Sequence, residues 1–436
     1  MFIRLIKRIR NNDIAARFLN GGFWSIAGAI SSKAVVLLAS IIVAHIVGKI
    51  QYGEYSIIRT TIFMFIALAS LGVGATSTKY IAQYRNTDLQ RAYNTYLVTS
   101  VFSTAFGIIT AILVFFTAQV IATEQLNEPN IATAIQCGAI LLIFCTVNGS
   151  QSGALAGFED FKHIALNNFI SSILELICIL IGAICYGVEG AILGSGIGYV
   201  LLTILNHLSI SKHFRRYNLS GWSRLKLSDF KIIWDFGLPA AMCNLVVIFA
   251  LWYSRTYLVQ LGGFGEIAIY NAADQIKALI LFIPGALSQM ILPMLTNIRA
   301  NGKIETYNKI FNYNVMINIG TSTVLSIIIS ILAPFILGLW GKTFVEPMPL
   351  ILLVASTIFS SFATVVGQAI ASQGKMWMGL LCNLIWSAIV LALSLMFVNN
   401  GLGATGLALA ILISYVIHGG YQYVYLKYFL LKNSKD

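Results

Sequence analysis

The stretch MWMGLLCNLIWSAIVLALSLMFV, residues 376–398, contains no charged side chain. A helix needs about 20 predominantly apolar residues to cross a bilayer, so this stretch is long enough to do so. Comparable stretches lie near residues 21–47, 57–77, 93–119, 131–155, 165–186, 190–210, 233–256, 267–295, 313–339, 349–372 and 403–426. Together they predict an all-α integral membrane protein with twelve transmembrane helices.

The composition of the 436-residue chain indicates the same class. Hydrophobic residues make up 58% of it and charged residues 10%, and the mean hydropathy is +0.82. A soluble domain has about 25% charged residues, so this composition excludes a soluble globular enzyme and a disordered chain. It also excludes a nucleic-acid partner, although the net charge is +12.

The basic residues explain that charge through the membrane topology. Most of the 28 Lys and Arg residues fall in connections on one side of the predicted bundle. The other side has Lys49, Arg59, Arg255 and Lys342. Because cytoplasmic loops are enriched in Lys and Arg, this asymmetry predicts a multi-pass membrane protein with both termini in the cytoplasm.

A weak internal repeat suggests how the helices are grouped. Residues 53–57 (GEYSI) match residues 265–269 (GEIAI), each after the first apolar stretch of one half. We therefore expect two six-helix bundles related by a pseudo-twofold axis along the membrane normal. The N-terminal bundle would comprise residues 1–210 and the C-terminal bundle residues 232–436, with residues 211–231 as a basic cytoplasmic linker.

Several short motifs resemble a known family. They are Phe23-Trp24-Ser25, Tyr52-Gly53-Glu54-Tyr55 after Gly48, LGVGA at 71–75, KYIA at 79–82, LAGF at 155–158 and FGLP at 236–239. In these motifs and over nearly its whole length, the chain resembles bacterial polysaccharide exporters of the O-antigen flippase type. This type belongs to the multidrug, oligosaccharidyl-lipid and polysaccharide exporter superfamily.

The resemblance implies a V-shaped molecule whose two bundles enclose a central lumen that opens alternately to each side. It further implies a transporter, not an enzyme, that carries an undecaprenyl-diphosphate-linked oligosaccharide, such as an O-antigen repeat unit of lipopolysaccharide, from the cytoplasmic to the periplasmic leaflet. Expected partners are this lipid-linked substrate and membrane lipids. Ion coupling and association with a polysaccharide polymerase complex stay open.

Four basic residues at membrane depth are candidate contacts for the anionic headgroup: Lys33, Arg59, Arg255 and Lys277. A charged side chain at the bilayer centre costs about 2.5–3.5 kcal/mol on insertion scales, so such residues usually face a wet cavity or a partner. A fixed cation there would offset the desolvation of a lipid diphosphate. Alternative roles are snorkelling for Lys33 and interfacial anchoring for Arg59 and Arg255.

Two acidic residues at membrane depth, Asp274 and Glu175, are candidate ion-coupling sites. A buried carboxyl group can hold a proton near neutral pH. The alternatives are a permanently protonated acid for either residue and, for Lys277, a neutralising pair with Asp274, which lies three residues away on the same helix face.

Two other functions remain possible from the sequence. A multidrug or toxin antiporter of the same superfamily would favour acidic residues in its cavity, whereas the basic candidates are the more numerous here. A membrane polysaccharide polymerase or ligase would need a large periplasmic loop, and the connections near 119–130 and 340–348 are short. No cofactor or metal is expected. The five histidines lack metal-ligand spacing, so we assign them no role.

Overall fold

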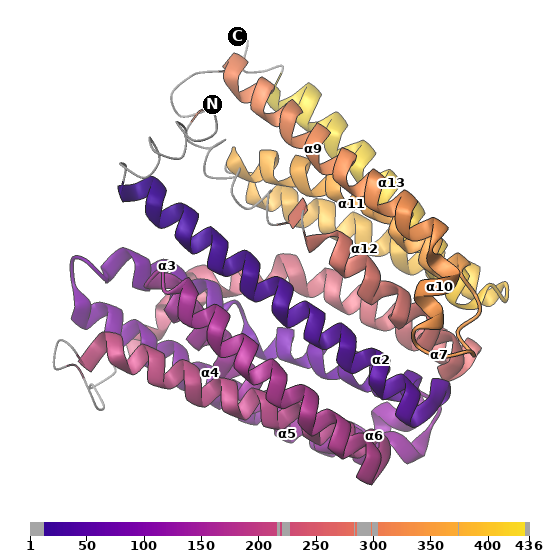
Figure 1. Cartoon of the computed structure of the whole chain (residues 1–436). Coiled ribbons are helices and arrows are strands. Elements are labelled where there is room, and N and C mark those ends of the chain that lie inside the picture. Colours follow the sequence, from indigo (N-terminus) through magenta and orange to yellow (C-terminus); the bar gives the residue numbers. More distant parts are fainter. Residues whose placement is uncertain are drawn as a thin grey trace. The chain divides into compact units, whose positions relative to one another are not determined.

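The computed structural model describes residues 13–215, 219, 227–282, 284–285, 298, 304–373 and 375–431 (Figure 1). Within these residues every regular element is a helix. Nine of the described helices are long and apolar enough to cross a membrane. The chain is therefore a multi-pass, all-helical membrane protein.

Three helices are too long for one crossing: α2 (Asp13–Ser70), α6 (Phe161–Arg215) and α7 (Leu238–Ile280). An α-helix rises about 1.5 Å per residue, so α2 alone would extend far beyond the bilayer core of about 30 Å. Each contains a glycine at positive φ that breaks the helix, namely Gly48 (φ 82°), Gly187 (φ 58°) and Gly263 (φ 76°). Each break falls between two of the predicted spans.

The other long helices are α4 (Leu89–Val120), α5 (Ala132–Gly157), α9 (Ile304–Ile331), α11 (Met348–Ser372), α12 (Met376–Asn399) and α13 (Gly403–Tyr425). The shorter helices are α3 (Val73–Tyr84) and α10 (Ala333–Gly338). The boundaries of most of the long helices follow the apolar stretches of the sequence closely. The number of twelve spans and their grouping into two bundles stay predictions.

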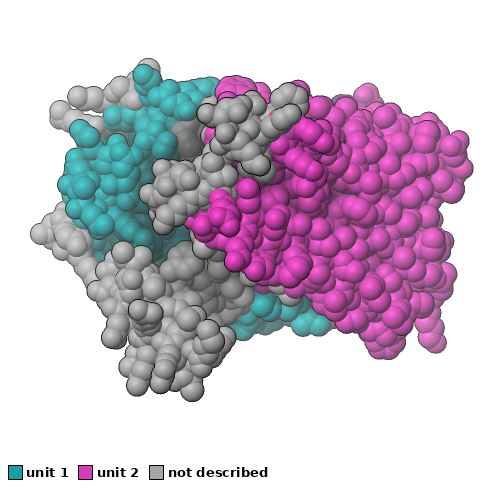
Figure 2. All heavy atoms as spheres, turned by 90° about the horizontal axis from the view of Figure 1, so that it is seen from above, with its two compact units in different colours: residues 1–39, 65–118, 132–241 teal, residues 40–64, 119–131, 242–436 magenta. Residues whose placement is uncertain are grey.

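The chain forms two compact units, coloured separately in Figure 2. Unit 1 comprises Met1–Ala39, Phe65–Ala118 and Ala132–Ala241, and unit 2 comprises Ser40–Met64, Gln119–Ile131 and Met242–Asp436. The predicted bundle boundary near residue 210 stays a prediction. Of the predicted linker, residues 216–218 and 220–226 lie outside the described residues.

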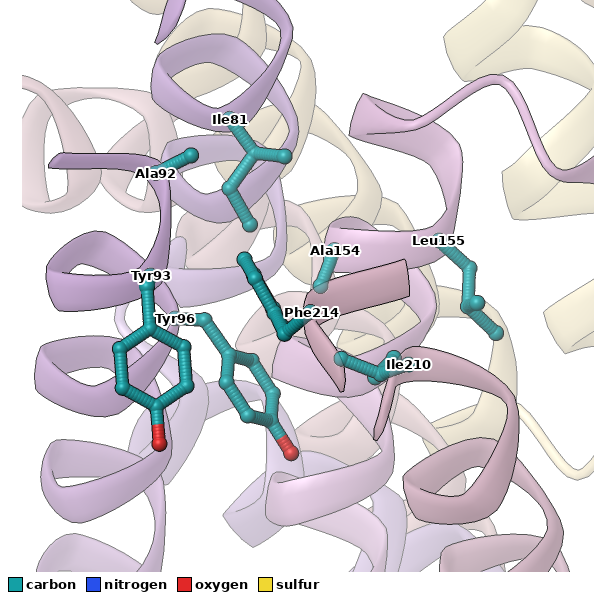
Figure 3. Packing of buried hydrophobic residues seen from close by; sticks show 8 residues of the cluster. All are labelled: Ile81, Ala92, Tyr93, Tyr96, Ala154, Leu155, Ile210 and Phe214. Atoms are coloured by element: carbon teal, nitrogen blue, oxygen red, sulfur yellow. The ribbon is translucent and has the colours of Figure 1, made fainter. Parts of the chain in front are cut away.

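Unit 1 has a hydrophobic cluster where α3, α4, α5 and α6 meet. In Figure 3 the ring of Phe214 lies at the centre of the labelled residues. Its centroid is 4.9 Å from that of Tyr93 and 5.8 Å from that of Tyr96. Aromatic pairs at such distances add about 0.5–1.5 kcal/mol to the burial of their apolar area. Through these contacts the C-terminal end of α6 packs against α4.

Beside this cluster, Asp160 joins the turn between α5 and α6 to the far end of α6. Its carboxylate lies 2.7 Å from Nδ1 of His163 and 2.6 Å from Nε2 of His213. The His213 ring stacks on Phe158 with a centroid distance of 4.6 Å. Burial disfavours the ionised carboxylate, but the hydrogen bonds to His213 and His163 outweigh it and lower the pKa of Asp160 to about 2.

We expect Asp160→Asn to reduce the free energy of unfolding at neutral pH by roughly 2 kcal/mol, because each unit of pKa shift corresponds to about 1.4 kcal/mol. A lowered pKa stabilises the folded state above the ordinary Asp value of about 3.9, and this contribution is lost as the pH falls through about 2. Thermal unfolding of the wild type and the variant from neutral pH to about pH 2 checks this expectation, because the difference between them should shrink at the acid end.

The matched control for this prediction is Asp88→Asn. Asp88 accepts a hydrogen bond from the backbone N–H of Arg91 at the start of α4, and its side chain is 42% exposed. Because Asn caps a helix about as well as Asp, this change should have little effect. Equal destabilisation by the two substitutions would contradict the role given to Asp160.

Unit 2 brings residues 40–64 of α2 against α7. Gly53 approaches the second part of α7 so closely that a Cβ atom would lie 2.0 Å from the carbonyl oxygen of Phe264. About two turns further along α7, Asn271 donates a 2.7 Å hydrogen bond to Ser56. Trp252, in the first part of α7, donates to Thr61 at 3.0 Å. Both parts of α7 therefore contact this segment of α2.

Helices α9, α11, α12 and α13 complete unit 2 and lie together in Figure 1. Serine and threonine side chains link α9 to α11, with Ser322 2.7 Å from Ser361 and Ser326 3.0 Å from Thr357. Small polar residues at such contacts let helices approach closely and bond across the interface in a membrane. Helices α9 and α11 are thus joined by hydrogen bonds as well as by apolar packing.

Candidate functional site

The charged cluster of unit 2 consists of Arg255, Asp274 and Lys277, all on α7. One carboxylate oxygen of Asp274 lies 2.8 Å from a guanidinium nitrogen of Arg255, and the other lies 3.2 Å from Nζ of Lys277. Arg255 and Asp274 are 19 residues apart, which would be about 28 Å along a straight helix. They meet because the backbone at Gly263 (φ 76°, ψ 179°) leaves the helical conformation and reverses the chain.

The cluster is largely shielded. The side chains of Arg255, Asp274 and Lys277 are 15%, 24% and 10% exposed. Two cations share one carboxylate, so the three groups carry a net charge of +1. Such a charge is costly at membrane depth, and residues of this kind usually face a cavity or a substrate pathway.

Arg255 is held in place from several sides. It donates to Thr60 at 3.3 Å, and its guanidinium lies 5.5 Å from the ring centroid of Tyr270. Its Nε is buried and has no hydrogen-bond partner among the described residues. The side chain is therefore oriented by neighbours but keeps one donor that none of those residues uses.

Arg59 lies next to Thr60, which accepts the bond from Arg255. Its guanidinium lies 5.5 Å from the ring centroid of Tyr55 and 5.7 Å from that of Phe63, and it donates to the Tyr55 hydroxyl at 3.0 Å. Cation–π contacts of this kind contribute about 0.5–1 kcal/mol at exposed sites and more when desolvated. The aromatic rings thus fix this guanidinium on the segment of α2 that packs against α7.

The structure groups three of the four predicted cations, Arg59, Arg255 and Lys277, in unit 2 together with Asp274. Lys33 and Glu175 lie in unit 1, and both are partly exposed. Glu175 packs against Gly198 within α6, where a Cβ atom on the glycine would lie 2.5 Å from the Glu175 Cβ. The roles proposed for all six residues stay predictions.

The pair between Lys277 and Asp274 bears on two of the alternatives raised by the sequence. The contact exists, but Asp274 also binds Arg255, so the pair does not neutralise the site. Two adjacent cations favour the ionised carboxylate.

A network of neutral hydrogen bonds adjoins the cluster. Ser40 Oγ lies 2.8 Å from the Tyr52 hydroxyl, 2.7 Å from the Gln275 amide nitrogen and 2.9 Å from the Trp340 indole nitrogen. Gln275 directly follows Asp274, so the network fixes the turn of α7 that carries the carboxylate. The sequence does not single out Ser40, Gln275 or Trp340, because a polar or aromatic residue in an apolar stretch gives no sign of its partner.

Among the described residues, no group of three His, Cys, Asp or Glu side chains is placed to hold a metal ion. The cluster itself offers one carboxylate and two fixed cations with their hydrogen-bond donors. Such groups bind anions, and phosphates in particular, because guanidinium and ammonium donors form charge-assisted hydrogen bonds with phosphate oxygens.

Comparison with known proteins identifies the family. Residues 18–299 match the family model described as polysaccharide biosynthesis protein. The lipid III flippase of Escherichia coli (strain K12) is 22% identical over 287 residues, which are 63% of this chain and 66% of that protein. The EPS I polysaccharide export inner membrane protein EpsE of Ralstonia nicotianae is 20% identical over 414 residues, 91% of each chain.

Among solved structures, the inward-facing conformation of a multidrug resistance MATE family transporter of the MOP superfamily is similar to this chain. The TM-score is 0.78 at 15% identity, over 94% of this chain and 99% of that one. At this identity the likeness shows the fold. The family expected from the sequence motifs is thereby confirmed, and the chain belongs to the polysaccharide biosynthesis protein family, with the fold of MOP superfamily transporters.

Proposed function

We propose that the protein carries a lipid-linked oligosaccharide with an anionic diphosphate headgroup from the cytoplasmic to the periplasmic leaflet of the inner membrane. The observation that supports this most is the Arg255–Asp274–Lys277 cluster, in which two cations share one carboxylate inside a membrane helix. A diphosphate loses its hydration on entering the membrane, and fixed cations offset that loss far better there than in water.

The headgroup would bind by displacing Asp274 from part of its contact with the cations. Phosphate oxygens would accept hydrogen bonds from Arg255 and Lys277, and Arg59 would supply a further positive charge. Lys33 is the fourth proposed contact, and Glu175 and Asp274 are the proposed ion-coupling residues.

The proposed movement is alternating access by two six-helix bundles, residues 1–210 and 232–436, around a central lumen. The breaks in α2, α6 and α7 support twelve crossings, because each divides one long helix into two pieces of about membrane length. Both termini would lie in the cytoplasm. A polysaccharide polymerase complex is the proposed partner on the periplasmic side.

Purified protein reconstituted in lipid vesicles tests this function. We expect transfer of a polyprenyl-diphosphate-linked oligosaccharide between leaflets, measured by its accessibility to an added enzyme that modifies the sugar. Accumulation of cationic drugs should stay at the level of protein-free vesicles, because the one carboxylate at the site is already paired with two cations. Drug transport without transfer of the lipid-linked sugar would instead identify a multidrug antiporter.

A further inference from the structure

Trp340 lies in the connection between α10 and α11, which the predicted topology places on the periplasmic side. Its side chain is 1% exposed, and its indole N–H donates a 2.9 Å hydrogen bond to Ser40 Oγ. A buried indole usually has a hydrogen-bond partner. Here the partner lies 300 positions away on α2, so this bond attaches the connection to the membrane-spanning part of unit 2.

The hydrogen bonds around Ser40 have defined directions. Ser40 Oγ accepts from Trp340 Nε1 and, at 2.7 Å, from the amide nitrogen of Gln275. A hydroxyl oxygen has two lone pairs, so Ser40 must donate its own proton to the Tyr52 hydroxyl, 2.8 Å away. The Gln275 amide nitrogen also donates to Tyr52, at 2.9 Å. Without the Trp340 donor, one lone pair of Ser40 would be unused and its hydroxyl could rotate away from Tyr52.

A second residue of the same connection, Phe344, also packs against α2. Phe344 is 2% exposed, and its ring centroid lies 6.1 Å from that of Tyr52, edge to face. Nζ of Lys49 lies 6.0 Å from the Phe344 centroid. Edge-to-face pairs and cation–π contacts of this kind are attractive. Phe344 therefore holds the connection against α2 when the Trp340 bond alone is removed, so this bond can be tested by itself.

The network reaches the charged cluster through the backbone of α7. Gln275 directly follows Asp274 and precedes Lys277 by two residues, so one helical turn carries all three. That turn also contains the 3.2 Å contact between Asp274 and Lys277, and Arg255 lies 2.8 Å from Asp274. Because two hydrogen bonds hold Gln275, the rotation of this turn is defined, and with it the direction in which the two charged side chains point.

We propose that Trp340 is a positioning residue for the headgroup site, so that the connection between α10 and α11 sets the affinity for the diphosphate. The inference rests on the proposed function. Trp340 acts through other residues, because its N–H fixes Ser40, Ser40 fixes Gln275, and Gln275 fixes the turn that carries Lys277. A site held in its binding geometry loses less entropy when the ligand binds. Movement of the connection would break the Trp340 bond, weaken the site and favour release of the headgroup.

Trp340→Phe is the informative variant, because it keeps a buried aromatic ring and removes the N–H donor. We would measure binding of a polyprenyl diphosphate to protein in lipid nanodiscs, and translocation of the lipid-linked oligosaccharide at saturating substrate. The affinity should fall about threefold to tenfold, which is the effect of one ordinary hydrogen bond. Translocation at saturation should not fall, because the residues that contact the headgroup are unchanged.

Trp386→Phe in α12 is the matched control. Trp386 is 2% exposed, and its buried indole nitrogen has no hydrogen-bond partner among the described residues. This substitution removes the same volume from unit 2 but no bond to Ser40, so the affinity should stay at the wild-type value. Equal losses of affinity in Trp340→Phe and Trp386→Phe would overturn the inference.

Ser40→Ala tests the same path from the acceptor side and serves if Trp340→Phe does not fold. Because Trp340 acts through Ser40, the double variant should bind no more weakly than Ser40→Ala alone. Wild-type affinity in either folded single variant, or a further loss in the double variant, would overturn the inference and leave the proposed function intact. Absence of binding by the wild-type protein would overturn both.

Discussion

Arg255→Ala is expected to reduce translocation of a lipid-linked diphosphate about tenfold to a hundredfold. A hydrogen bond to a charged group contributes about 1.5–3 kcal/mol, and each 1.4 kcal/mol is a factor of ten in affinity. The substitution removes the donor that is 2.8 Å from Asp274 and leaves Lys277 to neutralise the carboxylate, so the net charge of the cluster falls from +1 to zero. Translocation by equal amounts of reconstituted protein measures the effect.

Asp274→Asn is the control for Arg255→Ala, because it changes the net charge of the cluster in the opposite direction. It removes the competing carboxylate and raises the net charge of the cluster to +2, so headgroup affinity should stay equal or rise. Arg255→Lys keeps the charge but cannot reproduce both contacts of the guanidinium, to Asp274 and Thr60, and should retain part of the activity. If Arg255→Ala and Asp274→Asn lost binding equally, the cluster would have only a structural role.

Gly53→Val is expected to destabilise the protein by about 2–3 kcal/mol or more and to abolish transport. A Cβ atom at this position would lie 2.0 Å from the carbonyl oxygen of Phe264, and backbone cannot rotate away as a side chain can. Overpacking of an interior usually costs about 1–3 kcal/mol. The separation of α2 from α7 would also break the bond between Ser56 and Asn271. Thermal unfolding and translocation are the measurements.

Gly320→Val in α9 is the control for this prediction. Gly320 is helical, and a Cβ atom there would meet no atom within 4 Å. The valine side chain at this position therefore enlarges the residue without a clash against another helix. Similar loss of stability in the two variants would contradict the close approach at Gly53.

Much of the fold follows from the sequence, because membrane helices require long apolar stretches. The breaks at Gly48, Gly187 and Gly263 also lie where the apolar pattern ends. The pair between Asp274 and Lys277 could be predicted too, since residues three apart share a helix face. These features depend only on neighbouring residues.

Features that depend on how the helices are packed could not be predicted. Arg255 reaches Asp274 only because Gly263 reverses the chain, and the angle of that reversal has no sequence signal. The bond between Ser40 and Trp340 joins residues 300 positions apart.

The central claim is that cations in unit 2 carry the anionic headgroup of a lipid-linked oligosaccharide. Translocation of a polyprenyl-diphosphate-linked oligosaccharide by wild-type protein and Arg255→Ala in the same vesicles tests it most directly. We expect transfer by the wild type and a loss of about tenfold or more in the variant. Absence of transfer by correctly folded wild-type protein, or equal transfer by the two proteins, would contradict it.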